Sequence, residues 1–119
     1  MSNPISLQQG VEMTTLYRNE KEQILAPEFR GKDILPNSET FDRKSVEDLL
    51  AIPGCEKMRI YYGMDTDLKT HAIIVAVNAN NEDILPSAMQ VNLKDGEEYL
   101  WDNAHRCPPI CPEPSPLNP

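Results

Sequence analysis

Three cysteines and one histidine are the residues of this sequence whose types suggest metal chemistry. Cys107 and Cys111 stand in the stretch CPPIC, His105 precedes them by two residues, and Cys55 follows a Pro-Gly pair far upstream. Thiolate sulfur and imidazole nitrogen are the ligands of tetrahedral zinc sites, and a Cys₃His set is one of the usual combinations. These four residues define one hypothesis, a small zinc-binding protein.

The spacing within CPPIC argues against a zinc site. Common zinc ribbons and fingers take their ligands from matched, closely spaced pairs, and this sequence has no second pair. Two consecutive prolines favour polyproline II, in which residues four apart are separated by about 12 Å. That distance is too long for a shared metal or a disulfide unless the chain turns or an X-Pro bond is cis. We therefore expect Cys107 and Cys111 to be buried thiols, with a disulfide between them as an alternative.

A second set of candidate residues lies in the middle of the chain. Arg59 and Tyr61 share one face of a predicted strand, and His71 begins the next one. Together they could line a site for a small anionic ligand or for hydrolysis, and His71 could also activate Cys55 as a nucleophile. No oxyanion loop or third orienting group accompanies them, so an exposed sheet face and a structural thiol are the favoured interpretation.

The elements that position these residues begin with two helices. The stretch SLQQ, which starts at Ser6, fits a capping box and predicts a helix over residues 7–19. A second, shorter helix is predicted over residues 43–51, with Asp42 or Ser38 as its N-cap.

Strands follow the helices. Apolar and polar residues alternate over residues 58–62, and a run rich in β-branched residues covers 71–77. The intervening loop, GMDTDLKT, is rich in turn formers, so an antiparallel hairpin is expected. Shorter strand candidates cover residues 88–93 and 98–101. Helices before strands predict an α+β fold, with two N-terminal helices packed on a small antiparallel sheet of three to four strands.

A chain of 119 residues is expected to form one domain. We assign residues 1–105 to a single α+β domain and residues 106–119 to an extended, proline-rich C-terminal tail that lies over the sheet. Its apolar contacts are expected to be Ile110 and Leu117. The main core is expected where the second strand faces the helices, through Ile73, Val75, Val77, Leu16, Leu49 and Leu50.

The order of the motifs resembles a family of short, uncharacterised bacterial proteins. The resemblance rests on a capped ISL helix with MTTLYR, a short LL helix, GCEKMRIYYGMD, AIIVAV and CPPIC near the end. It covers most of the chain. It implies no activity, so it suggests a family without a function.

Charge and hydropathy exclude several classes of partner. The formal net charge of −8 disfavours nucleic acid and anionic membranes, which both attract basic surfaces. The N-terminus has no secretory pattern, and the clearest apolar run, AIIVAV, is far shorter than a membrane span. We therefore expect a cytoplasmic, non-enzymatic protein-interaction or accessory protein without cofactor. Its partner would be another protein, and a weak homodimer through the exposed edge of residues 58–62 is also expected.

Overall fold

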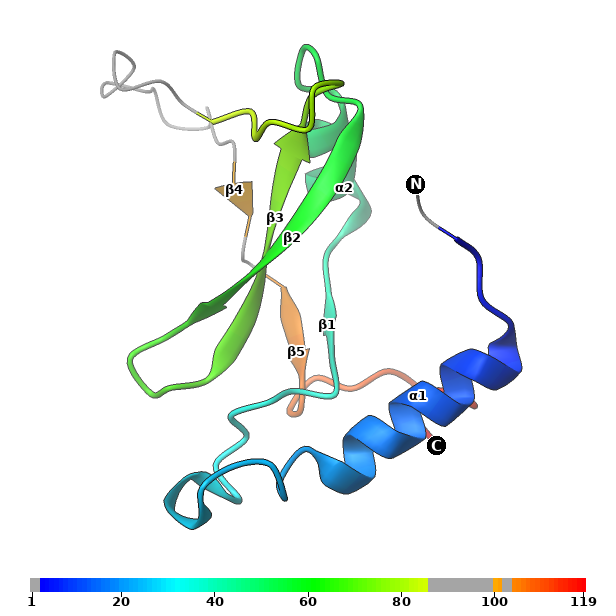
Figure 1. The fold of residues 1–119 in the computed structure, drawn as a ribbon, viewed down its shortest axis with the longest axis vertical. Coiled ribbons are helices and arrows are strands. Elements are labelled where there is room, and N and C mark those ends of the chain that lie inside the picture. Colours follow the sequence, from blue (N-terminus) through cyan, green and yellow to red (C-terminus); the bar gives the residue numbers. More distant parts are fainter. Residues whose placement is uncertain (1–2, 86–99, 102–103) are drawn as a thin grey trace.

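The computed structural model describes residues 3–85, 100–101 and 104–119, and within them the α+β class is confirmed (Figure 1). Two α-helices and two antiparallel sheets are present in this part of the chain, with strand orders β1-β5 and β2-β3-β4. In chain order the elements are α1 (Leu7–Glu20), the 3₁₀ turn η1 (Pro27–Phe29), β1 (Ser38–Thr40), α2 (Arg43–Leu50), β2 (Lys57–Met64), β3 (Thr70–Val77), β4 (Leu100–Trp101) and β5 (His105–Cys107).

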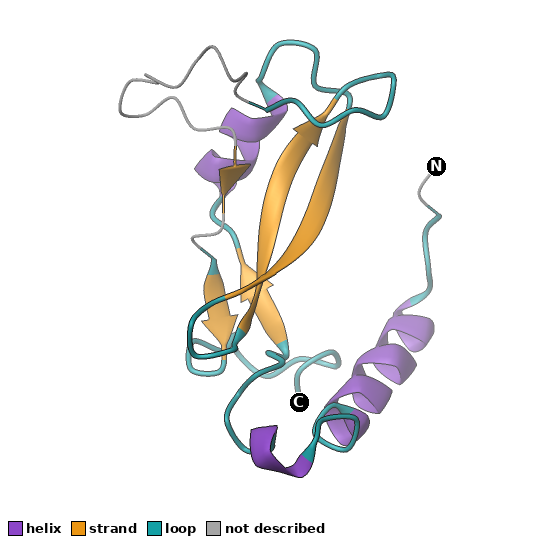
Figure 2. Cartoon of the chain, turned by 60° about the vertical axis from the view of Figure 1, so that its left-hand side comes forward, coloured by secondary structure: helices purple, strands orange, loops and turns teal. Residues whose placement is uncertain are grey.

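Helix α1 begins at the predicted capping box. The Ser6 hydroxyl accepts from the Gln9 backbone N–H at 3.0 Å, and the Gln9 side chain accepts from the Ser6 N–H at 2.9 Å. The sequence predicted where α1 lies along the chain. It did not predict how α1 packs, since none of the residues of this helix is buried. Figure 2 shows α1 standing apart from the strands. The expectation that both helices pack on the sheet is therefore wrong for α1.

Helix α2 is the helix that covers the sheet. Asp42 caps it by accepting from the Ser45 backbone N–H at 3.0 Å, as predicted. Leu49, on its inner face, is fully buried against Ile74 and Ala76 of β3. Partly buried apolar side chains packed against these residues complete the core, namely Phe41, Val46, Ile52, Cys55 and Ile84.

The predicted core differs from the observed one in which face of β3 meets the helix. Ile74 and Ala76 pack against α2, whereas the sequence favoured the alternate residues, which include Val75. Val75 is also buried, so both faces of β3 are covered at this point and alternation could not show which one faces α2. Leu16 and Leu50, also expected in the core, are 63% and 51% exposed.

Strands β2 and β3 form the predicted antiparallel hairpin. Their register runs from Lys57 opposite Val77 to Met64 opposite Thr70. β3 is the central strand because β4 pairs with its other edge. The strand candidate at 88–93 lies outside the described residues, and of the candidate at 98–101 only residues 100–101 are described.

The small sheet joins the end of the chain to the segment before α2. β1 and β5 pair antiparallel, with Ser38 opposite Cys107. Between them and the hairpin lies the buried side chain of Arg106, which donates to the carbonyl oxygens of Thr70, Asp33 and Ile34 at 2.7–3.0 Å. Arg106 and Cys107 therefore belong to a strand, although the sequence placed them in the tail.

The proline-rich tail lies against α1 rather than over the sheet, as Figure 1 shows. Arg18 of α1 donates to the Leu117 carbonyl oxygen at 2.7 Å. The Leu117 side chain packs beside Gly10, where an added Cβ would come within 3.4 Å of it. Ile110, the other expected apolar contact, is exposed. The tail therefore packs against α1 through Leu117.

Candidate protein-binding groove

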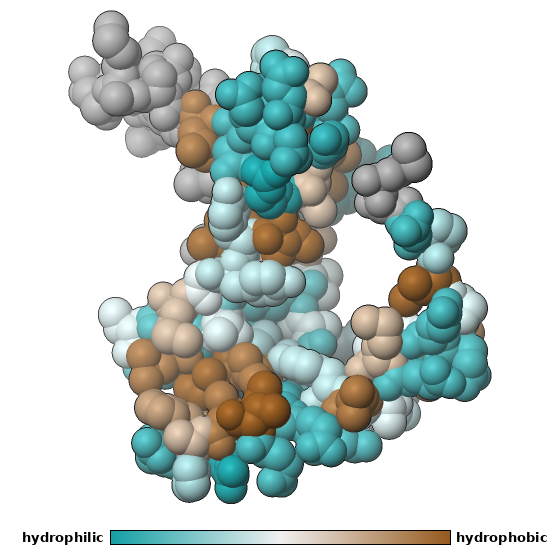
Figure 3. Space-filling model, in the orientation of Figure 1, coloured by the Kyte–Doolittle hydropathy of each residue, from teal (hydrophilic) through white to brown (hydrophobic). Residues whose placement is uncertain are grey.

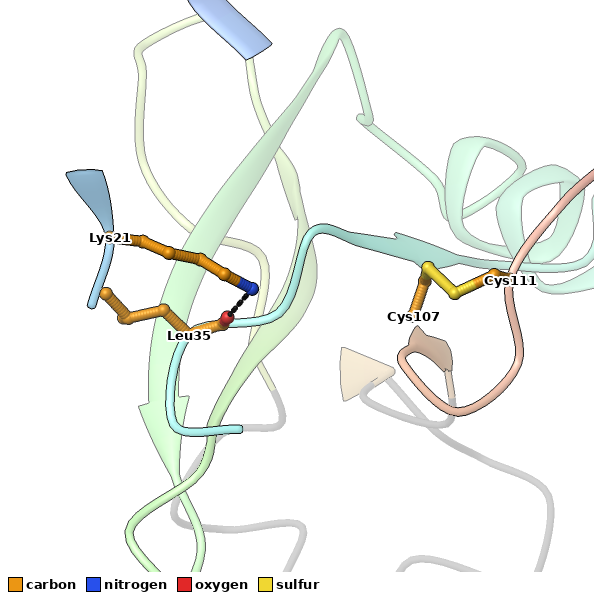
Figure 4. The surroundings of a disulfide bond; sticks show 4 residues. All are labelled: Lys21, Leu35, Cys107 and Cys111. Carbon is orange, nitrogen blue, oxygen red and sulfur yellow. Dashed lines mark hydrogen bonds between the residues drawn. A yellow bond between two sulfur atoms is a disulfide. The ribbon is translucent and has the colours of Figure 1, made fainter. Parts of the chain in front are cut away.

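The four proposed zinc ligands are not gathered into one site. Cys107 and Cys111 form a disulfide with a Cα–Cα distance of 4.6 Å (Figure 4). Cys55 lies before β2, where its thiol donates to the Lys57 carbonyl oxygen at 3.3 Å, and His105 begins β5. No group of three or more His, Cys, Asp or Glu side chains within the described segments is arranged to hold a metal.

The disulfide corrects the expectation of two unbonded thiols. The chain turns sharply within CPPIC, and the peptide bonds before Pro108 and Pro109 are both cis. Polyproline II spacing, on which the expectation rested, therefore does not apply to this stretch. The disulfide had been retained as the alternative.

The second candidate set, Arg59, Tyr61 and His71, is divided between two clusters. Arg59 and Tyr61 both bond to the carboxylate of Asp83. Arg59 also donates to the Asn81 side chain at 2.9 Å. Because these polar groups satisfy one another, they form a structural cluster rather than an open ligand site. His71 has different partners. It lies near the far end of the hairpin from Cys55, so the two do not form a nucleophile pair.

His71 contacts the hairpin loop. Its Nε2 lies 2.6 Å from Oδ2 of Asp65, whose Oδ1 accepts from the backbone N–H groups of Asp67 and Lys69. The hydrogen bond with His71 and these backbone donors hold the pKa of Asp65 below its usual range. His71 Nδ1 points toward β1, where it lies 3.8 Å from Oε1 of Glu39.

Glu39 is the functional candidate that the sequence did not reveal. Its side chain is only 7% exposed, and its Oε2 accepts from the Ala72 backbone N–H at 2.8 Å. Oε1 lies 3.8 Å from both Arg106 Nε and His71 Nδ1, too far for a hydrogen bond. Within the part of the chain that the structure describes, Oε1 is thus a buried acceptor without a partner, as is Oδ1 of Asn37. An acid in a three-residue strand gives no sequence signal of such burial.

Glu39 and Asn37 border a groove of about 710 Å³. The face of the β2–β3 hairpin forms one side, residues 35–41 form another, and α1 closes the third. Figure 3 shows an open space at the right between α1 and the body of the molecule, and an apolar surface gathered at the lower left. The volume is in the range of ligand-binding sites. Its apolar lining includes Met13 and Tyr17 of α1, Met58, Ile60 and Tyr62 of β2, and Ile74 of β3.

The wall formed by α1 is held by hydrogen bonds to backbone oxygens. The Tyr17 hydroxyl donates to the Pro36 carbonyl at 2.6 Å, and Lys21 Nζ donates to the Leu35 carbonyl at 2.9 Å (Figure 4). Partial burial raises the pKa of Tyr17. These bonds fix α1 at one end of the groove and leave its apolar side chains open to solvent.

The outer edge of β2 runs beside this groove. Three hydrogen bonds fix which backbone groups of the hairpin face inward. The Asp65 N–H donates to the Lys69 carbonyl across the hairpin, whereas the Ala72 N–H and the Ala76 carbonyl have their partners on the side of β3 that faces away from β2. Because antiparallel ladders alternate, the backbone groups of Met58, Ile60 and Tyr62 must point away from β3. The described residues supply no strand to pair with them. Their side chains, on the groove face, are substantially exposed.

Comparison with known proteins leaves the groove to be interpreted from its geometry. No family model, curated protein or solved structure matches the chain. Neither helix in the described segments has the length and apolar character needed to cross a bilayer.

Proposed function

We propose that this protein is a non-enzymatic protein-interaction protein that binds an extended segment of another protein. The segment adds a strand to the outer edge of β2 and places alternate side chains in the groove between the hairpin and α1. The observation that carries this proposal is an eight-residue strand whose outer edge pairs with none of the described strands and lies beside an open apolar groove.

A strand suits this edge better than a helix. The outward N–H and carbonyl groups of Met58, Ile60 and Tyr62 offer a row of hydrogen bonds that only an extended backbone can match. A helix satisfies its own backbone groups and would leave this row unpaired. In a strand the side chains alternate, so every second residue of the partner would meet the apolar groove.

Charge favours another protein over a second copy of this chain. β2 offers a second copy no complementary charge, because it has no acidic residue and its Arg59 is already paired with Asp83. The whole chains, each with a net charge of −8, would also repel each other. The weak homodimer expected from the sequence is therefore the competing occupant of this edge.

Selection from a random peptide library displayed on phage tests the proposal. Wild-type protein should enrich peptides with alternating apolar residues, and Ile60→Asp should weaken their binding at least tenfold, since a carboxylate would enter the apolar groove. Leu50→Asp is the matched control, because Leu50 is an aliphatic side chain of similar exposure on α2 and does not line the groove. It should bind as the wild type does. Circular dichroism confirms that both variants are folded.

Two results would overturn the proposal. Peptides that bind Ile60→Asp as well as wild type would place their site elsewhere. A dimer at low micromolar concentration in sedimentation velocity, dissociated by Ile60→Asp and not by Leu50→Asp, would assign the groove to a second copy.

A further inference from the structure

We infer that the bound segment carries a lysine or arginine whose cationic group reaches the polar wall formed by Asn37 and Glu39. This inference rests on the proposed function and specifies the chemistry of the partner. The site is the end of the groove where β1 meets β3, and the ligand is an ammonium or guanidinium group flanked by apolar residues.

The first argument is the hydrogen-bonding deficit of this wall. Asn37 Oδ1 and Glu39 Oε1 are the two buried side-chain polar atoms without a hydrogen-bond partner among the described residues, and both residues border the groove. Native structures leave few such atoms, because an unsatisfied buried polar group is destabilising. Asn37 lies in the bend directly before β1 and Glu39 lies within β1, so both belong to the same wall of the groove. Both lack a donor, which a lysine or arginine supplies.

The second argument is the charge of the wall. Two carboxylates, Glu39 and Asp65, lie beside the His71 ring, and the Arg106 Nε lies 3.8 Å from Glu39 Oε1. Glu39 is the acidic residue among those that line the groove. Nε and Nη2 of Arg106 are already bonded to three backbone carbonyls and do not bond to Glu39 Oε1. Among the described residues, no lysine or arginine lines the groove itself.

Access to Glu39 passes by His71. Oε1 has almost no accessible surface in the unbound chain, while the His71 side chain, 3.8 Å away, is 30% exposed and borders the groove. A rotation of this ring would open Oε1 to a donor from the groove. Binding of the cation therefore includes a movement of His71, which changes the chemical shifts of its ring.

A double-mutant cycle on a selected peptide tests the inference. The peptide is compared with a version that has norleucine in place of its lysine, or citrulline in place of its arginine, against wild-type protein and Glu39→Gln. Glutamine keeps an oxygen for the Ala72 N–H and removes the charge. Because hydrogen bonds to charged groups contribute about 1.5–3 kcal/mol, removing the cation should weaken binding to wild type about tenfold to a hundredfold. For Glu39→Gln, the two peptides should differ much less.

The outcomes separate this inference from the proposed function. Peptides that need Ile60 but show no enriched lysine or arginine, or no coupling to Glu39, would overturn the inference and leave the groove as the binding site. Failure to select any peptide that depends on Ile60 would overturn the proposed function as well. If Glu39→Gln does not fold, the comparison of the two peptides on wild-type protein still tests whether the cation contributes to binding.

Discussion

The same face of one hairpin is buried along β3 and exposed along β2. On β3, Ile74 and Ala76 are buried under Leu49 of α2, which has no exposed surface. On β2, Ile60 lies directly opposite Ile74, yet Ile60 and Tyr62 are 47% and 84% exposed. Both strands have apolar side chains on this face. What differs is the element that covers them, because α2 packs on β3, whereas β2 faces the groove that the tethered α1 borders.

In the proposed complex, α1 and β2 form one side of a core that the partner segment completes. A monomeric protein rarely exposes large contiguous apolar surfaces unless they serve an interaction. The apolar side chains of α1, including Met13 and Tyr17, and of β2, including Ile60, border one groove. The partner segment would supply for β2 the layer that α2 supplies for β3.

The largest expected effect comes from shortening one leucine in each helix, Leu49 in the buried core and Leu16 on the exposed side of α1. Leu49→Ala should lower the free energy of unfolding by about 2–5 kcal/mol, because it leaves a cavity in the closed core. Leu16→Ala, on the exposed side of α1, should change it by less than about 0.5 kcal/mol. Urea denaturation measures both. Equal losses in the free energy of unfolding would show that α1 is packed, and would contradict the contrast between the buried and the exposed apolar surface.

Breaking the disulfide should have the next largest effect. It closes a loop of five residues next to β5, so its removal should lower the free energy of unfolding by about 2 kcal/mol. A dithiol reductant should therefore lower the melting temperature of the wild type. The control is the double variant Cys107→Ser/Cys111→Ser, which should melt lower than wild type and show no response to the reductant. A wild-type protein that melts at the same temperature with and without the dithiol would contradict this.

Removing one tether of α1 should have a smaller and more local effect. Tyr17→Phe deletes the hydroxyl that bonds to the Pro36 carbonyl, at a cost of about 0.5–1.5 kcal/mol. Hydrogen exchange should become faster in α1 and stay unchanged in β3. Uniform acceleration over both elements would mean that α1 and the hairpin unfold as one unit.

The smallest effect concerns pH at the hairpin loop. The pKa of Asp65 is lowered in the folded protein, mainly by its hydrogen bond with His71, so the ionised form stabilises the fold. This contribution is complete above the unfolded pKa near 3.8 and is lost as pH falls through the lower, folded value. Asp65→Asn should therefore show a shallower loss of stability than wild type in this acidic range. Identical acid denaturation profiles for wild type and Asp65→Asn would show that Asp65 does not contribute to the pH dependence of stability.

Local signals in the sequence predicted the elements well. The cap at Ser6, the cap at Asp42 and the strand at 58–62 depend on neighbouring residues, and all three form as predicted. Packing was less predictable because it depends on distant residues. Met58, Ile60 and Tyr62 alternate as in a half-buried strand, yet all three are exposed. The two helices do differ locally, because the apolar side chains of α2 gather on one face more strongly than those of α1.

The groove could be predicted only in part. The sequence predicted that the strand at 58–62 has a less protected edge. It did not predict the polar wall of the groove, which Asn37 and Glu39 form. Glu39 is buried because β1 pairs with β5, a contact between residues far apart in the sequence. The disulfide was misjudged for a local reason, since prolines were assigned polyproline II geometry and the chain turns instead.

Hydrogen exchange along β2 tests the central claim most directly. Amides of Met58, Ile60 and Tyr62, which point outward, should exchange quickly in the free protein, and those of Arg59 and Tyr61, which face β3, should exchange slowly. Binding of a selected peptide should slow the three outward amides and leave the inward ones unchanged. A peptide that binds while those outward amides still exchange at their free rates would contradict the account of β2 as the edge that receives a partner strand.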